Sequence, residues 1–448
     1  MSGINDALVN SGNSLGTLER SLSVIQQNVG NASTPGYARQ DVVGAIDSLS
    51  DDAVTQTESS RDQFAEAAVR QQNSQFGYYD QLSSTLQAAQ TNFPANADSG
   101  IPSAINNLFS SFSALATSPN DPTARQQVIA QAGQVALAFN TTAANLTSLE
   151  ATTRQQISSE VENINHLAGL VQRFNVSNQA NSANAKDPIA DAKLNDTLEQ
   201  LSEYGNVQAL KQTDGSITLL LGGQTPLVVG QKQFPITADV TSGVTAAIRD
   251  ANGADITSEI TGGRLSGSLA ALNQSIPSYQ SGLNQLAQGL ADSVNSTLAG
   301  GADSNGAPGT PLFTYNSSTD AASTLAVSTI TTDQLAAASD SAPGGNGNAL
   351  ALTALGTAQN LNGFTYAGFF GNLSAQVGQD VSNVSSGQTL ETQLLAQARA
   401  QRTAVSGVSL DDEAVRLVEY QRAYEAVAKV VTVLDQVSSD TINMLTGT

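Results

Sequence analysis

The 448-residue chain contains no cysteine and no tryptophan, and His166 is its single histidine. Without cysteine there are no disulfide bonds and no thiolate metal sites. A histidine-based metal site or a Ser-His-Asp triad would have to be built around one residue. No run of about twenty apolar residues occurs, so we expect no membrane insertion. These absences also lead us to expect no cofactor.

Positive charge is scarce as well. Lys and Arg number 18 against 39 Asp and Glu, which gives a formal net charge of -21. Binding to nucleic acid needs a basic surface, and so does docking on an anionic membrane. We therefore expect no nucleic-acid partner. The N-terminus has neither a basic start nor a continuous apolar core, so we expect export, if any, to proceed without a cleaved signal peptide.

Both ends of the chain carry apolar residues at steps of three and four, the spacing of a helix that packs lengthwise on another helix. The stripes comprise Ile4, Leu8, Leu15, Leu18, Leu22, Ile25 and Val29, and then Leu417, Tyr420, Tyr424, Val427, Val431, Leu434 and Leu445. Short helices need a packing partner to be stable. We expect the termini to pair as a coiled coil, with each other or with neighbouring copies; an ordinary core helix at each end is the alternative.

The segments between the ends are mostly helical in pattern. Residues 62–93 and a segment beginning near Pro102 are followed by a proline-free run from Thr123 to about 185. At about 1.5 Å per residue, one helix over that run would span roughly 80 to 90 Å. A heptad run from Leu265 to Leu290 contains Pro277, which predicts a kink or a boundary between two helices. We expect the last helix before the C-terminal stripe to cover 390–405.

Short apolar runs between 205 and 263, separated by Asp214-Gly215, Gly222-Gly223 and Gly230, predict hairpins. The predicted fold class is α+β, mainly α, with terminal helices pairing as a coiled coil, an elongated helical bundle and a small inserted β domain. The predicted domains are 1–44 with 405–448 as the terminal coiled coil, 45–204 with 264–404 as the helical bundle, and 205–263 as the β insertion, with the loop 300–348 as a candidate addition to it.

Each terminal stripe has a motif beside it. After Asn31, the sequence Thr34-Pro35-Gly36-Tyr37 has proline at the second and glycine at the third position, which predicts a type II turn. Before the C-terminal stripe, Gly407 is placed to end one helix and Ser409 to cap the next. The acids that follow Leu410 would lie in the first helical turn, where negative charge favours the helix dipole. This placement explains them without a metal ion.

These motifs resemble a known group of proteins. The segment 28–40 resembles the N-terminal signature of bacterial flagellar rod, hook and hook-associated proteins, and 406–424 resembles their C-terminal signature. In the middle, 261–267, 286–292 and 305–309 resemble hook-associated protein 1, the FlgK family.

The resemblance implies a structural subunit of the flagellum, outside the cell, in a homo-oligomeric ring at the junction of hook and filament. Its partners would be the hook protein below, the filament or a second junction protein above, the filament cap, an export chaperone and the type III export apparatus. The two apolar stripes would form the subunit interface. The alternatives are another axial subunit (hook, rod or flagellin-like) or a secreted adhesin whose β domain binds a ligand.

One motif points to catalysis. Gly12-Asn13-Ser14-Leu15-Gly16 has the spacing of a nucleophile elbow, which requires a strand before it, a helix after it and a histidine base. Here it lies inside a predicted helix, and His166 is the only base available. We therefore expect no enzyme activity.

Overall fold

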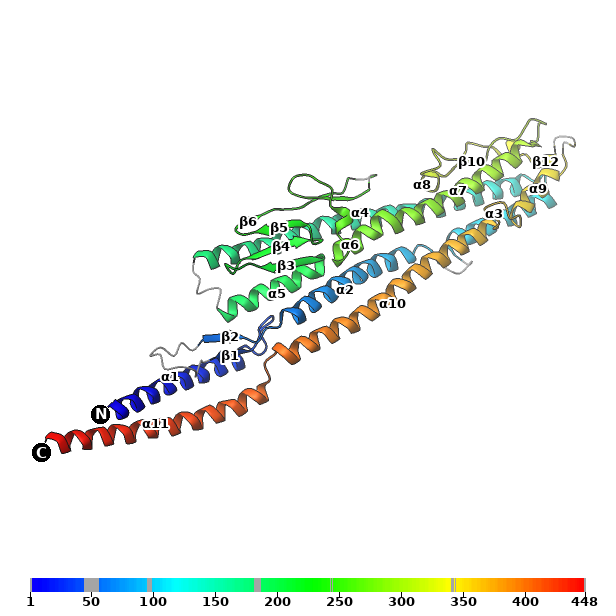
Figure 1. Cartoon of the computed structure of the whole chain (residues 1–448). Helices are drawn as coiled ribbons and strands as arrows, with labels where there is room; N and C mark the ends of the chain where they lie inside the picture. The colour runs from blue at the N-terminus through cyan, green and yellow to red at the C-terminus, as the bar shows by residue number, and fades with distance from the viewer. Residues whose placement is uncertain are drawn as a thin grey trace. The chain divides into compact units, whose positions relative to one another are not determined.

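The computed structural model describes residues 2–43, 56–94, 99–180, 187–241, 243, 245–339, 342 and 344–446. Contacts divide the chain into two compact units, the first formed by Met1–Phe76, Asn163–Pro235 and Glu391–Thr448, and the second by Gly77–Glu162 and Ile236–Leu390. The predicted three-part division is a different partition and stays a prediction; its boundary at 44/45 lies outside the described residues. The predicted fold class is confirmed: long helices dominate and the sheets are small (Figure 1).

The terminal helices of the first unit are α1 (Ser2–Asn31) and α11 (Leu410–Thr446). They lie side by side and antiparallel, so that the two chain ends meet at the same end of the pair (Figure 1). Beside the inner end of α1, β1 (Gln40–Val43) pairs antiparallel with β2 (Gln56–Ser59). The predicted pairing of the termini therefore occurs within one chain.

The rest of the first unit includes α5 (Pro188–Tyr204) and a four-stranded antiparallel sheet in sequential order. Asp187 caps α5 by accepting the amide of Ile189, and Pro188 stands at the first helical position. The strands are β3 (Val207–Lys211), β4 (Ile217–Leu221), β5 (Thr225–Val229) and β6 (Lys232–Gln233). Gly222 and Gly223 both have positive φ in the turn between β4 and β5, a conformation that strongly favours glycine.

Three helices agree with the sequence prediction: α2 (Gln63–Gln90), α3 (Gly100–Thr117) and α4 (Pro122–Ala180). The 59 residues of α4 give a length of about 90 Å. Its predicted continuation to 185 lies outside the described residues. No helix in the described part of the chain is long and apolar enough to cross a bilayer.

In the second unit, α6 (Gly263–Ala270) is joined to α7 (Ile276–Ala299) through a π-helical turn (Ala271–Ser275). Pro277 lies just after that turn. Proline has no N–H and its ring crowds the carbonyl four residues earlier, and the wider π turn accommodates both effects. The predicted boundary is confirmed. The small elements of the unit are β7 (Thr237–Asp239), β8 (Ala247–Arg249), β9 (Gly301–Ala302), β10 (Phe313–Thr314), α8 (Ala321–Thr324), β11 (Ala326–Val327), β12 (Ala338–Ser339) and α9 (Gly347–Leu355).

One helix boundary was predicted wrongly. Helix α10 (Tyr366–Ser406) begins 24 residues before the predicted start at 390. Its first half is rich in glycine and serine, which hides the helical period. Packing explains one of these glycines, because a Cβ on Gly387 would lie 2.3 Å from the ring of Tyr79. Close approach of α10 to α2 thus overrides local propensity.

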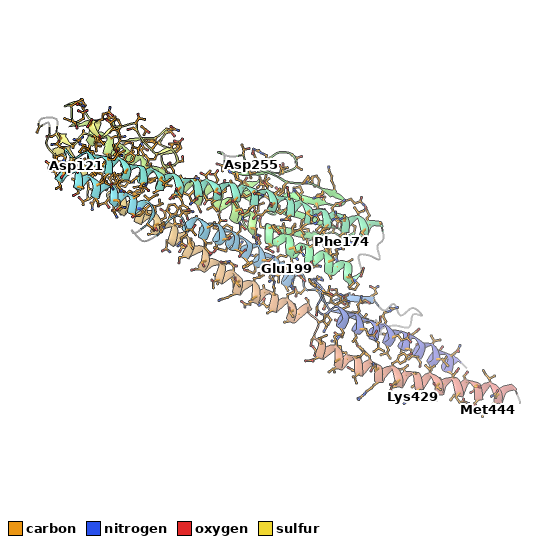
Figure 2. All side chains as sticks on the ribbon, turned by 180° about the vertical axis from the view of Figure 1, so that it is seen from behind. Asp121, Phe174, Glu199, Asp255, Lys429 and Met444 are labelled. Carbon is orange, nitrogen blue, oxygen red and sulfur yellow. The ribbon has the colours of Figure 1, made fainter. Side chains whose placement is uncertain are left out.

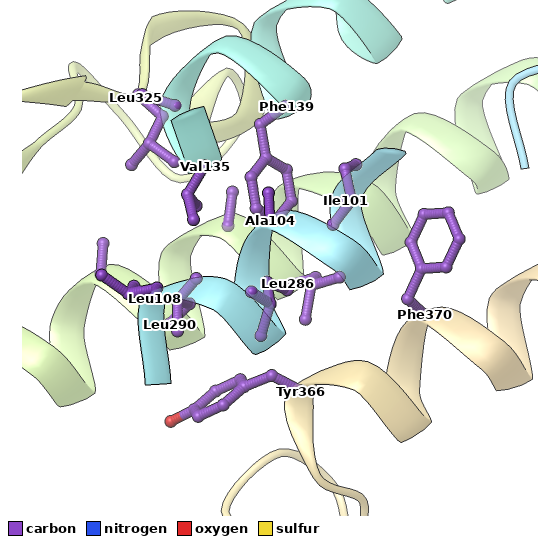
Figure 3. Packing of buried hydrophobic residues seen from close by; sticks show 14 of the residues in the cluster. Ile101, Ala104, Leu108, Val135, Phe139, Leu286, Leu290, Leu325, Tyr366 and Phe370 are labelled. Atoms are coloured by element: carbon purple, nitrogen blue, oxygen red, sulfur yellow. The ribbon is translucent and has the colours of Figure 1, made fainter. Parts of the chain in front are cut away.

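The core of the second unit is densely apolar. Side chains of α3, α4, α7 and α10 converge there, among them Ile101, Phe139, Leu286 and Phe370 (Figure 3). The rings of Phe93 and Tyr279 add an edge-on contact with centroids 5.9 Å apart. Burying one such side chain contributes roughly 1.5–3 kcal/mol, so this unit has a complete hydrophobic core of its own.

Candidate assembly interface

The predicted terminal stripes lie along the α1–α11 pair, and we call them the inner seam. On α1, Ile25 is buried, Val29 is exposed and the other five predicted residues are half-buried. On α11 all six residues from Leu417 to Leu434 are half-buried, while the side chain of Leu445 lies outside the described residues. The hydroxyl of Tyr424 donates to the Glu19 carboxylate at 3.0 Å across the pair. These side chains serve contact within one chain, and a role between subunits stays a prediction.

A second apolar face of α11 was missed by the sequence analysis. We call it the outer stripe; its members are Val415, Val418, Val430, Val433, Val437 and Met444. Each is between 43% and 85% exposed. Met444 marks the end of this helix in Figure 2. A sequence signal exists, because in Val430-Val431 and Val433-Leu434 one residue faces the seam and its neighbour, about 100° around the helix, faces outward.

So much exposed apolar surface on one helix needs an explanation. Single exposed apolar residues are ordinary, but contiguous patches mark sites of protein–protein or membrane contact. Polar neighbours such as Lys429 and Asp435 keep the helix amphipathic rather than wholly apolar. Full burial of one Val, Ile or Met side chain contributes roughly 1.5–3 kcal/mol. The outer stripe can therefore supply substantial binding energy to whatever covers it.

The inner end of α1 is fixed by a buried asparagine. Asn28 is 1% exposed, and its side chain exchanges two 2.9 Å hydrogen bonds with the backbone N–H and carbonyl of Gln40. The Tyr37 hydroxyl donates to the same Asn28 Oδ1 at 3.0 Å. Burial, and then the charge of Glu413, raise the pKa of Tyr37 to about 12. Three elements are thereby held together by one amide side chain.

The predicted turn after α1 is present. The Tyr37 amide donates to the Thr34 carbonyl at 3.1 Å, and Gly36 has φ 71°. Asn31 closes the end of α1 by donating to the Gln27 carbonyl. A Cβ on Gly36 would lie 2.3 Å from the carbonyl oxygen of Ala192 in α5. Glycine is therefore required both by the backbone conformation and by close packing, with Pro35 fixing the turn before it.

The link between α10 and α11 has the capping residues that the sequence predicts. The Gly407 amide donates to the Thr403 carbonyl and ends α10, while Ser409 Oγ accepts the amide of Asp412 at 3.3 Å and begins α11. Ser406 binds the opposite segment: its carbonyl accepts the amide of Arg39, and its hydroxyl accepts the amide of Asp62. The two connections to the terminal pair are thus hydrogen-bonded to each other.

A partly buried ion-pair network supports this region, and sequence reasoning missed it. Glu66 of α2 pairs with Arg61 and with Arg402 of α10. Arg402 also binds Glu199 of α5 at 2.5 Å, and Arg61 donates to the Gly36 carbonyl at 2.6 Å. Burial opposes ionisation of Glu199, but hydrogen bonding and the charge of Arg402 outweigh it and hold its pKa below the usual value. The network therefore ties three helices to the turn.

The residues weighed for catalysis form no catalytic arrangement in the described part of the chain. Ser14 is on α1 and donates to the carbonyl of Asn10 one turn earlier, and His166 is exposed on α4. Asp411, Asp412 and Glu413 occupy the first turn of α11, as predicted. Among the described residues there is no group of three or more His, Asp or Glu side chains placed to hold a metal ion.

Comparisons with known proteins agree with this geometry. The family model described as flagellar hook-associated protein FlgK helical domain matches residues 86–313, and that of the flagellar basal body rod FlgEFG protein C-terminal region matches 399–444. Flagellar hook-associated protein 1 of Bacillus subtilis strain 168 is 25% identical over 96% of both chains. Its namesake in Salmonella typhimurium is 26% identical over 68% of this chain and 58% of its own length.

A solved structure shares the fold. The flagellar hook junction protein FlgK from Burkholderia pseudomallei superposes with a TM-score of 0.68 at 16% identity, covering 76% of this chain and all of that one. The resemblance found in the sequence is confirmed, and the adhesin alternative finds no support. Since the helical-domain model alone matches just over half of the residues, the chain belongs to the FlgK family of flagellar hook-associated proteins, which are structural proteins of the flagellum and not enzymes.

Proposed function

We propose that this chain is a subunit of the junction between flagellar hook and filament and that it assembles there into a ring of identical copies. The relative from Burkholderia is titled a hook junction protein, and those from Bacillus and Salmonella are named hook-associated protein 1. The rod-protein match at 399–444 covers only the C-terminal region. The helical-domain match and the full-length relative therefore support the junction over a rod or hook position.

The observation that carries this proposal is the outer stripe of α11. Within the chain α11 pairs with α1 through the inner seam, so the outer stripe has no such partner in the described part of the molecule and is available to a neighbouring copy. A repeated copy-to-copy contact of this kind is heterologous, the type of interface that builds rings and helical tubes. The inner seam forms the hairpin, and the outer stripe joins the hairpins.

The proposal includes the wider flagellar context. The hook protein lies below the ring, and the filament or a second junction protein lies above it under the filament cap. The chain reaches its place outside the cell through the type III export apparatus with a dedicated chaperone. The side chains of the terminal pair are only partly buried within one chain, which suits this route. A segment that completes its packing only on assembly is easily unfolded before assembly.

The direct test is the substitution Val433→Asp on the outer stripe. Val433 is 60% exposed, so the change costs the isolated chain little, but it places a charge in an apolar contact between copies. We expect a normally folded chain, lost filaments and absent swarming. The matched control is Thr432→Asp at the neighbouring exposed position. Full motility and filament retention in the Val433 variant, measured by swarming and electron microscopy, would refute assembly through this face.

A further inference from the structure

The first unit contains a groove that the terminal helices do not use. It consists of two adjoining cavities of about 290 and 360 Å³ between α2 and β3, which share Ala67, Arg70 and Ala209. We call it the α2–β3 groove. Its floor is apolar: Leu198 is buried and Phe174 is half-buried there, while the ring of Phe64 stands 88% exposed at its edge. Figure 2 labels Phe174 on α4.

Arg70 is the unusual residue in the groove. Arg70 lines both cavities, yet its guanidinium makes no ion pair and no hydrogen bond with the residues that the structure describes. The neighbouring Arg61 is different, because Glu66 and Asp191 neutralise it. Burial lowers the pKa of Arg70, opposed by the charge of Glu66. Lys211, at the end of β3, adds a further positive charge to the lining.

Two buried polar atoms in the lining also lack a partner among the residues that the structure describes. Asn178 is 5% exposed, and its Nδ2 donates to the Gly215 carbonyl while its Oδ1 accepts nothing. Ser74 is 4% exposed, and its Oγ has no hydrogen-bond partner. Buried polar groups in proteins are nearly always paired. Asn178 lies on the cavity that contains Lys211, and Ser74 lies on the other.

The polar groups that lack a partner, together with the apolar floor, define the chemistry of a ligand for the groove. A carboxylate would satisfy Arg70 through paired N–H donors. An N–H group would satisfy Asn178 Oδ1, and an apolar side chain would cover Phe64 and the floor. A peptide segment with an Asp or Glu beside an apolar residue combines all three features.

We propose that the α2–β3 groove binds an acidic peptide segment from a neighbouring copy of this chain. The inference rests on the proposed function, which places copies side by side. Charge complementarity carries the choice of occupant: each copy has 39 acidic residues against 18 basic ones, so adjacent copies repel unless their few cations meet acids of the neighbour. Arg70 is a cation without an ion pair in the part of the chain that the structure describes.

The experiment uses a photo-reactive phenylalanine analogue in place of Phe64, at the edge of the groove, in the full chain assembled into flagella. Irradiation of isolated flagella is expected to give a crosslinked homodimer, with the second site at an acidic segment identified by mass spectrometry. Arg70→Glu, added to the same chain, should reduce that product at least fivefold. Arg173→Glu is the matched control, since Arg173 is exposed on α4 outside the groove lining.

Each outcome decides the proposal. A homodimer that depends on Arg70 but not on Arg173 supports it. A crosslink to a different protein, no crosslink, or equal loss in both Arg variants overturns it while leaving assembly through the outer stripe intact. Failure of the proposed function would be seen in a different experiment, in which Val433→Asp chains would still form junctions. The Arg70→Glu chain is checked for folding by its far-ultraviolet circular dichroism and thermal midpoint.

Discussion

The core of the second unit and the terminal helix pair are both helical and apolar, but they are packed to different degrees. Phe112, Phe139 and Leu286 have no exposed surface. Over 410–444, where the side chains of α11 are described, the only buried residue is Glu413. Two helices bury one face of each other, whereas a bundle surrounds its core on all sides. The second unit is complete as a folded body, whereas the terminal pair leaves the outer stripe of α11 exposed.

The strongest test of this contrast removes a core side chain. Phe139→Ala deletes a fully buried ring and should lower the free energy of unfolding of the second unit by about 3–5 kcal/mol. The matched control, Leu137→Ala, lies two residues away and is 59% exposed, so it should cost less than about 1 kcal/mol. Urea unfolding followed by amide exchange in α3 and α7 measures both. Similar losses for the two variants would contradict a fully packed core.

The second test concerns a charge inside the same unit. Glu160 is 5% exposed and accepts a 2.9 Å hydrogen bond from Ser268 through one carboxylate oxygen. Burial raises its pKa to about 7 from 4.5, partly offset by Ser268 and by the charge of Arg264. A raised carboxyl pKa contributes stability that is full below about pH 4.5 and lost as pH rises to about 7.

Glu160→Gln keeps the shape and removes this titration. Above pH 7 the variant should be more stable than the natural chain by as much as about 3 kcal/mol, and the difference should vanish near pH 4. Thermal and urea unfolding between pH 4 and 8 give the profile. Glu162→Gln, at an exposed position on the same helix, is the control. A pH profile unchanged by the Glu160 substitution would show that this carboxyl has the same pKa in the folded and in the unfolded chain.

The terminal pair should respond far less to truncation. Leu434 is half-buried on the inner seam, so Leu434→Ala should cost about 1 kcal/mol and act only on the local opening of α1 and α11. Hydrogen exchange on the monomer checks this: amides of α11 should exchange much faster than those of α3 and α7 in the natural chain and faster still in the variant. Equal protection of α11 and α7 would make the terminal helices ordinary core helices.

These regions also differ in how well sequence predicts them. Periodicity within one segment gave α4, the terminal helices and the boundary at Pro277, because each depends on neighbours in sequence. The Glu66–Arg402 contact joins residues 336 positions apart and leaves no local pattern. The contact of Gly387 in α10 with Tyr79 in α2 is likewise long-range, so the glycine-rich part of α10 shows no local helical pattern. The adjacent apolar residues Val430-Val431 and Val433-Leu434 are a sequence signal for the outer stripe, but only the structure shows which residue of each pair faces α1.

The smallest expected effect concerns the polar contact across the terminal pair. Tyr424→Phe removes the hydroxyl that donates to Glu19 and keeps the ring on the inner seam. Because the Glu19 carboxylate at this exposed contact can bind water instead, the loss should be at most about 0.5 kcal/mol. Exchange rates of α11 amides in the monomer measure it, and Tyr420→Phe, a half-buried tyrosine one turn earlier, is the control. A loss above about 2 kcal/mol would mean that polar contacts, rather than apolar packing, hold α1 and α11 together, and the contrast with the second unit would then be one of chemistry and not of incomplete burial.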